Sequence, residues 1–395
     1  MSRPPAQHRR PRAAWGRAAF ALFAVAAGTT VPTPLLLLYR DELHLTGPAS
    51  TVIFGVYAAG LAPSLLGAGP LSDRYGRRPL VLPFTLLAGL ASLLFLLAAD
   101  SFPLLLVARF VQGLVSGAVF TAASAWLAEL SAAEGQPQAA GRRSAVALAG
   151  GFSLGPLVSS VLAVTLPGPL ALPYLAHAAL AVAGFLIVLR LPETAPRRRR
   201  QAGDPARAPL VRRGDRLLAL TALAPVAVCV YGFPATVIAG LPVLIDLPGN
   251  GVLATGVLAG LTLGAGAVVA PLQRRLGTWT AVAAATSGTA GFVLCVTAAA
   301  TDLWPVLIPA GLLLGAGSGW SLASGLALTG RLSAPERRGT LTGIFYTVAY
   351  LGFAAPFLVT SAARTHGSVA PLVAVTVATA VLAARLVPAA RAGRI

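Results

Sequence analysis

The 395-residue chain is too apolar for a water-soluble globular protein, because 56% of its residues are hydrophobic and only 11% are charged. Its mean hydropathy is +0.78. The net charge of +18 comes from 30 basic residues, all of them arginine, and would suit a nucleic-acid binder if the arginines were clustered on a folded surface. The run from Arg197 to Arg200 instead lies between apolar segments. We interpret it as a topology signal and expect no nucleic-acid partner.

The first half of the chain contains six apolar stretches, each close to the roughly 20 residues that a helix needs to cross a bilayer. They lie at residues 15–38, 50–69, 79–99, 102–127, 144–166 and 170–191. The first stretch follows an arginine-rich start, as in a secretory signal, but it is longer than a signal core and lacks a small-x-small cleavage pattern. We therefore expect it to be retained as the first span.

Six more apolar stretches follow a connector rich in arginine and proline at residues 192–215. They lie at residues 216–245, 251–272, 279–300, 303–325, 339–362 and 368–384. The sequence thus predicts an all-α membrane protein of about twelve transmembrane helices in two pseudo-symmetric six-helix bundles. The bundles would be residues 1–191 and 216–395.

Arginine-rich and arginine-poor loops alternate along the chain. The basic loops open at Arg74, Arg142, Arg197, Arg274 and Arg337, and the loops near Asp41, Asp100, Asp246 and Asp302 are poor in arginine. The positive-inside rule then predicts a multi-pass protein of the inner membrane with both termini in the cytoplasm. The lipid bilayer is its expected partner, and we expect a monomer.

The two halves share sequence features, which indicates a duplication. The segment AGPLSDRYGRRP from Ala68 is echoed by VAPLQRRLGTW from Val269, so that Pro70 and Gly76 recur as Pro271 and Gly277. Both pairs are 201 residues apart. Internal repeats of this kind are typical of secondary transporters.

Several motifs resemble those of the major facilitator superfamily, and the resemblance covers the whole chain. The segment from Gly69 to Arg78 is similar to the loop between the second and third helices of that family. Three further elements stand where the family would place them: Arg109, Gln112, Gly113 and Gly117 in the fourth span, Gly151, Gly155 and Pro156 in the fifth, and Leu191 to Thr194 after the sixth. The fifth-span motif resembles that of twelve-span drug/proton antiporters, although Ser159 and Ser160 replace a usual glycine pair.

The resemblance implies a switchable charge cluster at the cytoplasmic surface, which we call the latch. Its residues are Gly69, Asp73, Arg74, Gly76, Arg77, Arg78 and Glu129. Arg77 is expected to pair with Glu129, and Asp73 to face the start of the eleventh span near Gly339 and Thr340. On this basis Asp73→Asn should impair turnover more than Glu129→Gln. The alternative is that the loop only sets topology. In the second half Arg274 takes the place of Asp73, so no matching latch is expected there.

Arg109 lies within an otherwise uncharged span, where an ionised group costs at least roughly 2.5 kcal/mol unless it faces protein or water. It should point into the bundle, together with Gln112 and Ser116 on the same helical face. The glycines of this face also suit a tight helix-packing seam. We expect Arg109 to recruit a partner such as Asp41, substrate or water.

No Asp or Glu falls near the centre of a predicted span, so Asp41 and His177 are the candidate protonatable groups for coupling. A lone histidine in a helix is either a proton relay or a packed, hydrogen-bonded residue. The side chains of Tyr231, Trp320, Tyr346 and Tyr350, with Ser116, either line a cavity or only pack. Prolines at 32 and 34 in the first span, and the pair Gly232 and Pro234 in the seventh, predict helix breaks at a binding site.

Taken together, the sequence favours a secondary active transporter that works by alternating access. We expect proton-coupled export of a small, partly hydrophobic compound that is neutral or anionic. One alternative is an uptake symporter or facilitator for a sugar or organic acid, and another is a non-transporting receptor or scaffold of the same fold. An enzyme is not expected, because no nucleophile, base and orienting acid cluster and no metal-ligand spacing occurs. No cofactor or metal is expected.

Overall fold

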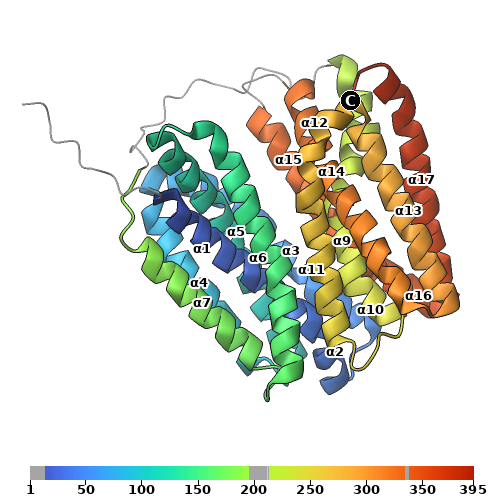
Figure 1. The fold of residues 1–395 in the computed structure, drawn as a ribbon, viewed down its shortest axis with the longest axis horizontal. Helices are drawn as coiled ribbons and strands as arrows, with labels where there is room; N and C mark the ends of the chain where they lie inside the picture. Colours follow the sequence, from blue (N-terminus) through green and yellow to red (C-terminus); the bar gives the residue numbers. More distant parts are fainter. Residues whose placement is uncertain (1–13, 195–210, 212, 334–337) are drawn as a thin grey trace, which may run out of the picture.

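The computed structural model describes residues 14–194, 211, 213–333 and 338–395, and these form helices without any strand. Figure 1 shows two groups of helices side by side, the first in blue to green and the second in yellow to red. Most of the predicted connector at 192–215, including Arg197 to Arg200, and the loop at Arg337 lie outside the described residues.

Seven helices make up the first half. Span one consists of α1 and α2, and spans two to six are single helices. Their bounds are Ala14–Thr30 (α1), Pro32–Glu42 (α2), Gly47–Tyr75 (α3), Arg78–Leu97 (α4), Phe102–Ala133 (α5), Ala140–Thr165 (α6) and Leu172–Val188 (α7).

The second half has more interruptions within its spans. Span seven runs through α8 (Arg216–Leu218), a π-helical segment (Ala219–Leu223), α9 (Ala224–Ala235), a second π-helical segment (Thr236–Gly240) and α10 (Leu241–Leu244). The remaining helices are α11 (Val252–Val269), α12 (Gln273–Leu276), α13 (Thr280–Thr301), α14 (Leu307–Leu332), α15 (Arg338–Tyr350), α16 (Ala355–His366) and α17 (Val369–Arg391).

The predicted twelve-span, all-α fold is confirmed. Ten helical runs among the described residues are long and apolar enough to cross a membrane, and α7 is a shorter apolar helix. One of the ten, Val252–Thr301, contains both α11 and α13. The chain reverses between them at Gly277, whose φ of 55° is available to glycine at little cost.

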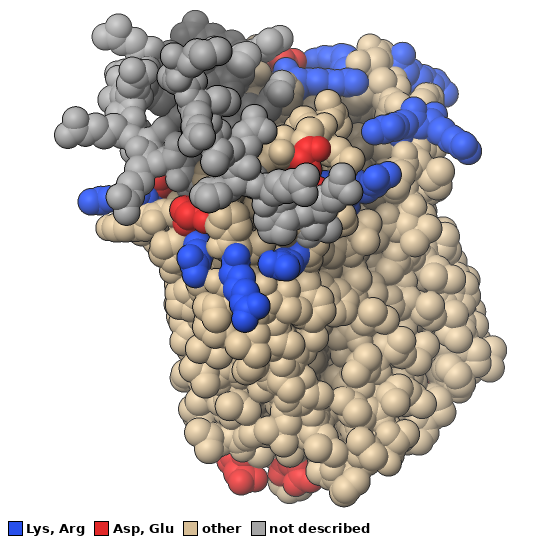
Figure 2. Space-filling model, turned by 60° about the vertical axis from the view of Figure 1, so that its left-hand side comes forward, with Lys and Arg blue, Asp and Glu red and all other residues tan. Residues whose placement is uncertain are grey.

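Charge separates the two ends of the molecule. In Figure 2 arginine side chains gather towards one end of the visible face together with some acidic ones, whereas the charged side chains visible at the other end are acidic. We call these the arginine-rich end and the acidic end. The first contains the end of α3, the start of α4 and α12, and the second contains Asp41 and Glu42 at the end of α2. The apolar band between them is the surface expected to face lipid.

Proline explains the break in span one. Pro32 has no backbone N–H, so it cannot donate to the Gly28 carbonyl one turn earlier. That carbonyl accepts the Val31 N–H at 3.3 Å instead, and the helical hydrogen-bond pattern is interrupted at Val31, whose dihedral angles stay helical. The sequence predicts a matching break at Gly232 and Pro234 in span seven, and this position is wrong. Helix α9 continues through Pro234, and the irregular segment is the π-helical turn that follows. Single π-helical turns of this kind are frequent at functional sites.

Several helix pairs join the halves, and two of them make the most extensive contacts. Helix α6 packs against α11, and α3 packs against α16. A Cβ atom at Gly256 in α11 would lie 2.0 Å from the Ser160 hydroxyl of α6, so the two backbones approach closely because this residue is glycine. Near the acidic end, the hydroxyls of Thr51 in α3 and Thr360 in α16 are hydrogen-bonded at 3.3 Å.

Candidate functional site

Arg109 is the only charged side chain among the buried residues that the structure describes, with 1% of its surface exposed. It lies in α5 and points into the first half, as the sequence predicts. Its Nε donates to the Ile53 carbonyl of α3 at 3.1 Å, and its Nη1 donates to the Thr29 carbonyl of α1 at 3.0 Å and to Gln112 Oε1 at 2.7 Å. The guanidinium therefore ties spans one, two and four together at membrane depth.

Gln112 completes this network at the break in span one. Its side-chain amide donates to the Gly28 carbonyl at 2.8 Å. This is the carbonyl that Pro32 leaves without its helical donor. Since Arg109 binds the next carbonyl, Thr29, the polar pair on α5 binds the backbone of span one beside the break between α1 and α2. Any movement of span one relative to α5 would have to break or remake these bonds.

Five aromatic side chains meet next to Arg109 where the two halves join. We call them the junction cluster: Phe54 and Tyr57 from α3, Tyr231 from α9, Tyr350 from α15 and Phe353 from the turn before α16. The Arg109 guanidinium lies 5.6 Å from the centre of the Phe54 ring and 5.4 Å from that of Tyr57, which is cation–π distance.

Phe353 links the two sides of the junction cluster. Its ring centre lies 5.3 Å from that of Phe54 in the first half and 5.1 Å from that of Tyr231 in the second. Tyr231 and Tyr350 are stacked at 4.8 Å with an angle of 9° between their planes, and their hydroxyls are 3.5 Å apart. These aromatic faces and phenol groups can hold a partly hydrophobic compound that also makes hydrogen bonds.

The two predicted protonatable groups do not join this network. Asp41 lies at the acidic end with its side chain 65% exposed, 3.4 Å from Arg40, so the expectation that it partners Arg109 is wrong. His177 is buried between spans one, three and six. Its Nε2 lies 3.0 Å from the Ala24 carbonyl, and its Nδ1 lies 2.6 Å from the Ser92 hydroxyl. A neutral imidazole with its proton on Nε2 satisfies both contacts, which favours the packed, hydrogen-bonded interpretation.

The other candidate cavity residues differ in their surroundings. Ser116 donates to the Gln112 carbonyl within α5, and the Trp320 indole N–H donates to the Val269 carbonyl at the end of α11, which fixes α14 against α11. Tyr346 packs edge-on against Phe345 at 5.6 Å. Of the four aromatic candidates, Tyr231 and Tyr350 are thus the two that belong to the junction cluster.

The span-five motif mediates close packing. Cβ atoms at Gly151 and Gly155 would lie 2.5 Å from the Phe23 carbonyl oxygen and 2.3 Å from that of Ala27, so α6 lies directly against α1. The Pro156 carbonyl oxygen faces Gly256 of the second half, at 2.7 Å from the position of a Cβ atom there. The motif therefore places span five in contact with span one on one side and with span eight on the other.

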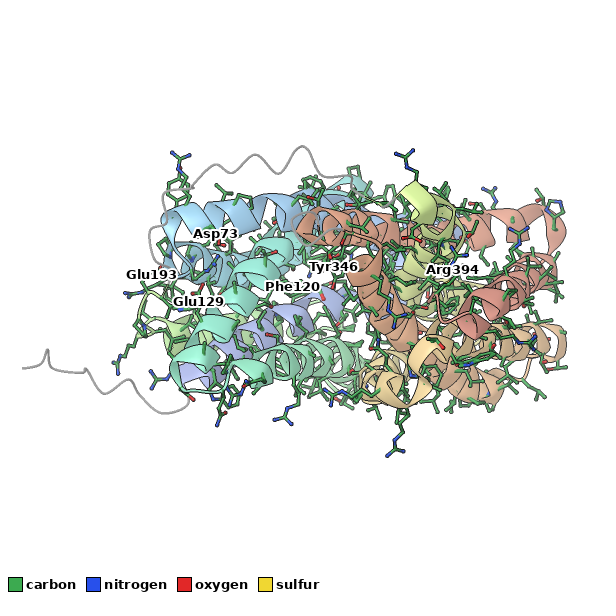
Figure 3. All side chains as sticks on the ribbon, turned by 90° about the horizontal axis from the view of Figure 1, so that it is seen from above. Asp73, Phe120, Glu129, Glu193, Tyr346 and Arg394 are labelled. Carbon is green, nitrogen blue, oxygen red and sulfur yellow. The ribbon has the colours of Figure 1, made fainter. Side chains whose placement is uncertain are left out.

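The latch residues form an ion-pair cluster at the arginine-rich end (Figure 3). Arg77 pairs with Glu129 at 3.0 Å and with Asp73 at 2.6 Å. Burial opposes the charge of Arg77, but Glu129 and Asp73 together raise the pKa of its guanidinium above the ordinary value. Contrary to the predicted loop, Gly69, Asp73 and Arg74 lie within α3, and the exposed Arg74 lies 5.2 Å from the Tyr75 ring.

Glu193 adds a contact that the sequence pattern did not assign. Its carboxylate accepts the backbone N–H groups of Arg77 at 3.0 Å and Arg78 at 2.9 Å, at the start of α4. A carboxylate is favourable there because the first amides of a helix lack helical partners and carry partial positive charge. Gly76 has a φ of 108°, and a Cβ atom on it would lie 2.5 Å from Glu193 Oε2. The resemblance pointed to the segment containing Glu193 but not to this contact.

These cluster contacts all lie within the first half. Thr194 donates to Glu129, and Arg78 Nη2 donates to the Leu189 carbonyl at 2.8 Å, so spans two, three, four and six are joined. The expected approach of Asp73 to the start of span eleven involves Gly339, whose surroundings lie outside the described residues. That part of the latch stays a prediction.

A family model of the Major Facilitator Superfamily matches residues 18–356. The chain belongs to the Major Facilitator Superfamily. Among its curated relatives is the multidrug resistance protein MdtL of Shewanella sp. strain ANA-3, 44% identical over 87 residues, which are 22% of each chain. The protein of the same name from Shigella flexneri serotype 5b is 37% identical over 86 residues, again 22% of each. The matched region thus spans about a fifth of these relatives.

Solved structures of the superfamily show the same fold over nearly the full length. A peptide transporter of the POT family has a TM-score of 0.80 at 14% identity, with 96% of this chain and 94% of that chain covered. The nucleoside transporter NupG has a TM-score of 0.72 at 13% identity, with 96% and 99% covered. The predicted resemblance to this superfamily is confirmed, and the likeness of these two structures concerns the fold.

Proposed function

We propose that this superfamily member is a secondary active transporter that exports a small, partly hydrophobic compound, neutral or anionic, in exchange for protons. The observation that supports the proposal best is the junction cluster beside Arg109. It brings aromatic faces, phenol groups and a buried cation to the contact between the two halves. Binding sites at such repeat interfaces near the bilayer midplane are usual in secondary transporters.

Charge decides which compounds fit. The buried side chains of the described spans include Arg109 and no carboxylate. The Arg109 charge would repel a cationic drug there, because no carboxylate balances it. It would attract an anion and would not repel a neutral aromatic compound. The relatives named for multidrug resistance support export rather than uptake.

Alternating access is supported by how the halves make contact. The two halves meet through the glycine-mediated approach of α6 and α11, the threonine pair near the acidic end and the Phe353 contacts. The ion pairs of Arg77 with Asp73 and Glu129 join helices of the first half. We assign the arginine-rich end to the cytoplasm by the positive-inside rule, in a monomer of the inner membrane with both termini on the cytoplasmic side.

The test is transport by the full-length chain in proteoliposomes with an imposed pH gradient. A panel of matched neutral, anionic and cationic aromatic compounds would be loaded, and efflux would be compared with and without the gradient. The proposal expects gradient-driven flux of neutral or anionic members and little flux of the cationic ones. Flux that ignores the gradient would remove the antiport claim.

Uptake of an organic acid is the second candidate, because the Arg109 guanidinium is a natural partner for a carboxylate. In the same proteoliposomes an uptake symporter would accumulate the acid when protons enter in the same direction. Absence of gradient-driven or passive flux across the whole panel would favour the third alternative, a non-transporting receptor or scaffold.

A further inference from the structure

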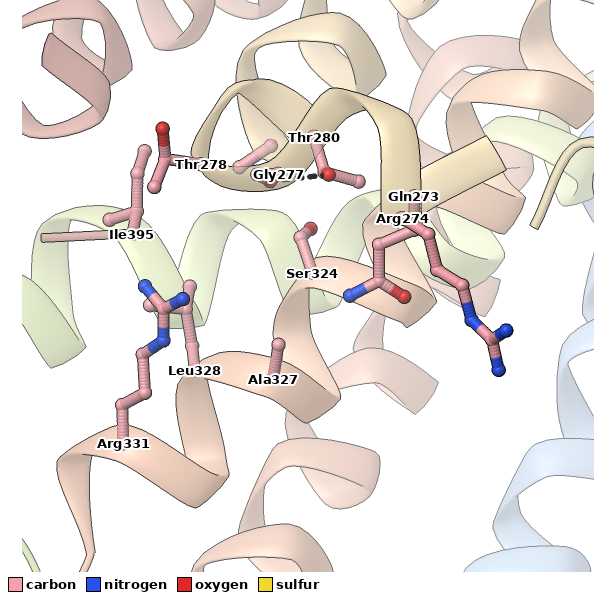
Figure 4. A pocket seen from close by; sticks show the side chains of 11 residues that line it. Gln273, Arg274, Gly277, Thr278, Thr280, Ser324, Ala327, Leu328, Arg331 and Ile395 are labelled. Atoms are coloured by element: carbon pink, nitrogen blue, oxygen red, sulfur yellow. Dashed lines mark hydrogen bonds between the residues drawn. The ribbon is translucent and has the colours of Figure 1, made fainter. Parts of the chain in front are cut away.

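Two pockets among the described residues differ in whether their buried hydroxyl groups have partners. The first lies between α12, α13 and α14 and opens at the arginine-rich end (Figure 4). Its buried hydroxyls, on Thr280 and Ser324, donate to backbone carbonyls at 2.7 and 2.8 Å. Its two arginines, Arg274 and Arg331, are exposed. The buried hydroxyls of this pocket therefore need no ligand.

The second pocket is a small cavity between the two halves, towards the acidic end, which we call the hydroxyl cavity. Helices α2 and α10 meet there, near the lower end of the molecule in Figure 1. Thr33 of α2 and Thr255 of α11 both line it and are each only 1% exposed. Neither hydroxyl has a hydrogen-bond partner among the described residues. Because a buried hydroxyl without a partner is costly, this pair indicates a bound ligand. The complete lining is Thr33, Leu36, Leu37, Ser50, Ile238, Ala239, Pro242, Val243 and Thr255.

A pair of serines in span five fixes the backbone beside both threonines. Ser159 donates to the Val31 carbonyl at 2.7 Å, two residues before the first threonine. Ser160 lies against Gly256, the residue after the second threonine, where a Cβ atom would be only 2.0 Å from the serine hydroxyl. Since one helix packs beside both threonines, their side chains are held at a single site that neither half forms alone.

The size and the lack of charge of the hydroxyl cavity favour a single water molecule. Its volume is about 10 Å³, close to the smallest volume that holds a water, roughly 10–15 Å³. None of the nine lining residues is charged, so no side chain there would offset the desolvation of an ion. A buried water needs about two to four polar partners. The Ser50 hydroxyl is a third one, because its bond to the Thr46 carbonyl is long at 3.5 Å.

We propose that the hydroxyl cavity binds one water molecule, which bridges the Thr33 hydroxyl of the first half to the Thr255 hydroxyl of the second. The water donates to one hydroxyl and accepts from the other. It adds a link between the halves to the direct pair of Thr51 and Thr360, whose hydroxyls are 3.3 Å apart. The cavity shares no lining residue with the junction cluster, so the water site does not rest on the transport proposal.

The sign of a stability change separates a bound water from a dry cavity. Thr255→Val keeps the shape of the side chain and removes its hydroxyl. With the water bound, this variant removes one of its partners, so the thermal unfolding midpoint of the full-length protein should fall by about 1–4 °C. In a dry cavity the same change would remove an unsatisfied group and raise the midpoint. Thr33→Val should act in the same direction as Thr255→Val. The control is Thr165→Val, exposed on α6 with its hydroxyl bonded within its own helix, which should leave the midpoint unchanged.

The double variant and a direct view of the water complete this test. Combining Thr33→Val with Thr255→Val should recover most of the lost stability, because both partners of the water become apolar groups of the same shape. Electron cryomicroscopy at a resolution that shows ordered water should place density between the two hydroxyls in the wild type and none in the double variant. A raised midpoint in either single variant would overturn the proposal, as would wild-type density that is absent or that persists in the double variant.

The water bridge also closes the acidic end, and this part of the inference rests on the proposed function. Thr33 and Thr255 separate when the two halves part at that end, so losing the bridge should favour the open state. Spin labels at Asp100→Cys and Thr301→Cys, two exposed positions at the ends of spans three and nine, report the distance between the halves.

Pulsed electron spin resonance on these labels should show the open-to-closed ratio rising about three- to tenfold in Thr255→Val. The control variant Thr165→Val should leave the ratio unchanged. An unchanged ratio in Thr255→Val would overturn the role of the water in closing the acidic end. One fixed distance in every variant would instead contradict the proposed function, whereas the stability test and the density still decide whether the water is bound.

Discussion

The two halves share a backbone plan but differ in where they keep their charges. In the first half, Arg109 and Gln112 bind the Thr29 and Gly28 carbonyls of span one, and Arg77 is paired with Asp73 and Glu129. Gly117 and Gly315 pack in the same way against spans two and eight and are 198 residues apart, so Leu307 and Ala310 stand in place of Arg109 and Gln112, and both are buried and apolar. The junction cluster is shared, because Phe54 and Tyr57 come from the first half and Tyr231, Tyr350 and Phe353 from the second. The buried charge thus belongs to one half, whereas both halves supply aromatic contacts.

The largest expected effect comes from removing the buried charge. Arg109→Ala removes a buried donor from Gln112 Oε1 and from the Thr29 and Ile53 carbonyls, and each buried acceptor left unsatisfied costs roughly 1–3 kcal/mol. Gradient-driven flux should fall roughly 100-fold, which corresponds to about 3 kcal/mol, while the protein still inserts. The measurement is initial flux in proteoliposomes at equal protein content.

The control for Arg109 is Arg40→Ala, which removes an arginine at the exposed end of the same half. Its pair with Asp41 is largely solvated and contributes about 0–1 kcal/mol, so flux should change by less than about fivefold. Wild-type flux in Arg109→Ala would mean that Arg109 only packs. The buried charge of the first half would then have no role in transport.

The next largest effect on turnover is expected at the two acidic residues of the latch, Glu129 and Asp73. The sequence placed Asp73 first, because the resemblance gave it the contact with span eleven. The Asp73 side chain is 67% exposed, however, whereas that of Glu129 is 28% exposed and binds both Arg77 and Thr194. We therefore expect Glu129→Gln to lower turnover about tenfold and Asp73→Asn to lower it at most about fivefold. Steady-state flux over a range of substrate concentrations separates turnover from binding, and the reverse order would return the main role to Asp73.

A smaller and different effect is expected at the aromatic junction. Phe353→Ala removes the ring that contacts both Phe54 and Tyr231, and aromatic pairs contribute about 0.5–1.5 kcal/mol beyond their buried area. The apparent KM should rise about two- to tenfold with little change in maximal flux. Phe357→Ala is the control, because Phe357 is 39% exposed on α16. Equal KM values in the two variants would mean that the junction cluster only packs.

The smallest effect on transport is expected at His177. Its imidazole is satisfied by the Ala24 carbonyl and the Ser92 hydroxyl, so His177→Ala should leave the pH dependence of flux unchanged. The same variant should lose about 1–3 kcal/mol of stability, because the buried Ser92 hydroxyl loses its partner and the smaller side chain leaves a cavity. Flux across pH 5 to 8 and thermal unfolding are the two measurements, and a displaced pH profile would restore the histidine as a proton relay.

Sequence alone predicted the architecture well, because long apolar stretches and alternating arginine-rich loops follow directly from the physics of the bilayer. It ended span two at residue 69, since charges follow, whereas α3 continues to Tyr75. Residues that project beyond the apolar layer can stay helical while their charges face water or each other. Composition therefore marks the apolar layer rather than the helix end.

The site was less predictable because its partners are mostly backbone atoms. The burial of Arg109 and its neighbour Gln112 could be read from helical spacing, but the Thr29, Ile53 and Gly28 carbonyls carry no sequence signal. Phe353 and Glu193 were missed for a related reason. Each acts through residues distant in sequence, and only the packing of the helices brings those residues together.

The most direct test of alternating access is the distance between the arginine-rich ends of spans four and ten. Ala132→Cys and Leu326→Cys place spin labels at two exposed positions, and the native Cys229 and Cys295 are buried and should react poorly. Pulsed electron spin resonance in lipid nanodiscs would be compared at pH 5 and pH 8, with and without Glu129→Gln. If the halves alternate between two states, there should be two distance populations whose ratio changes with pH and shifts about tenfold in the variant, equivalent to about 1.4 kcal/mol. A single distance that is the same in all four conditions would contradict it.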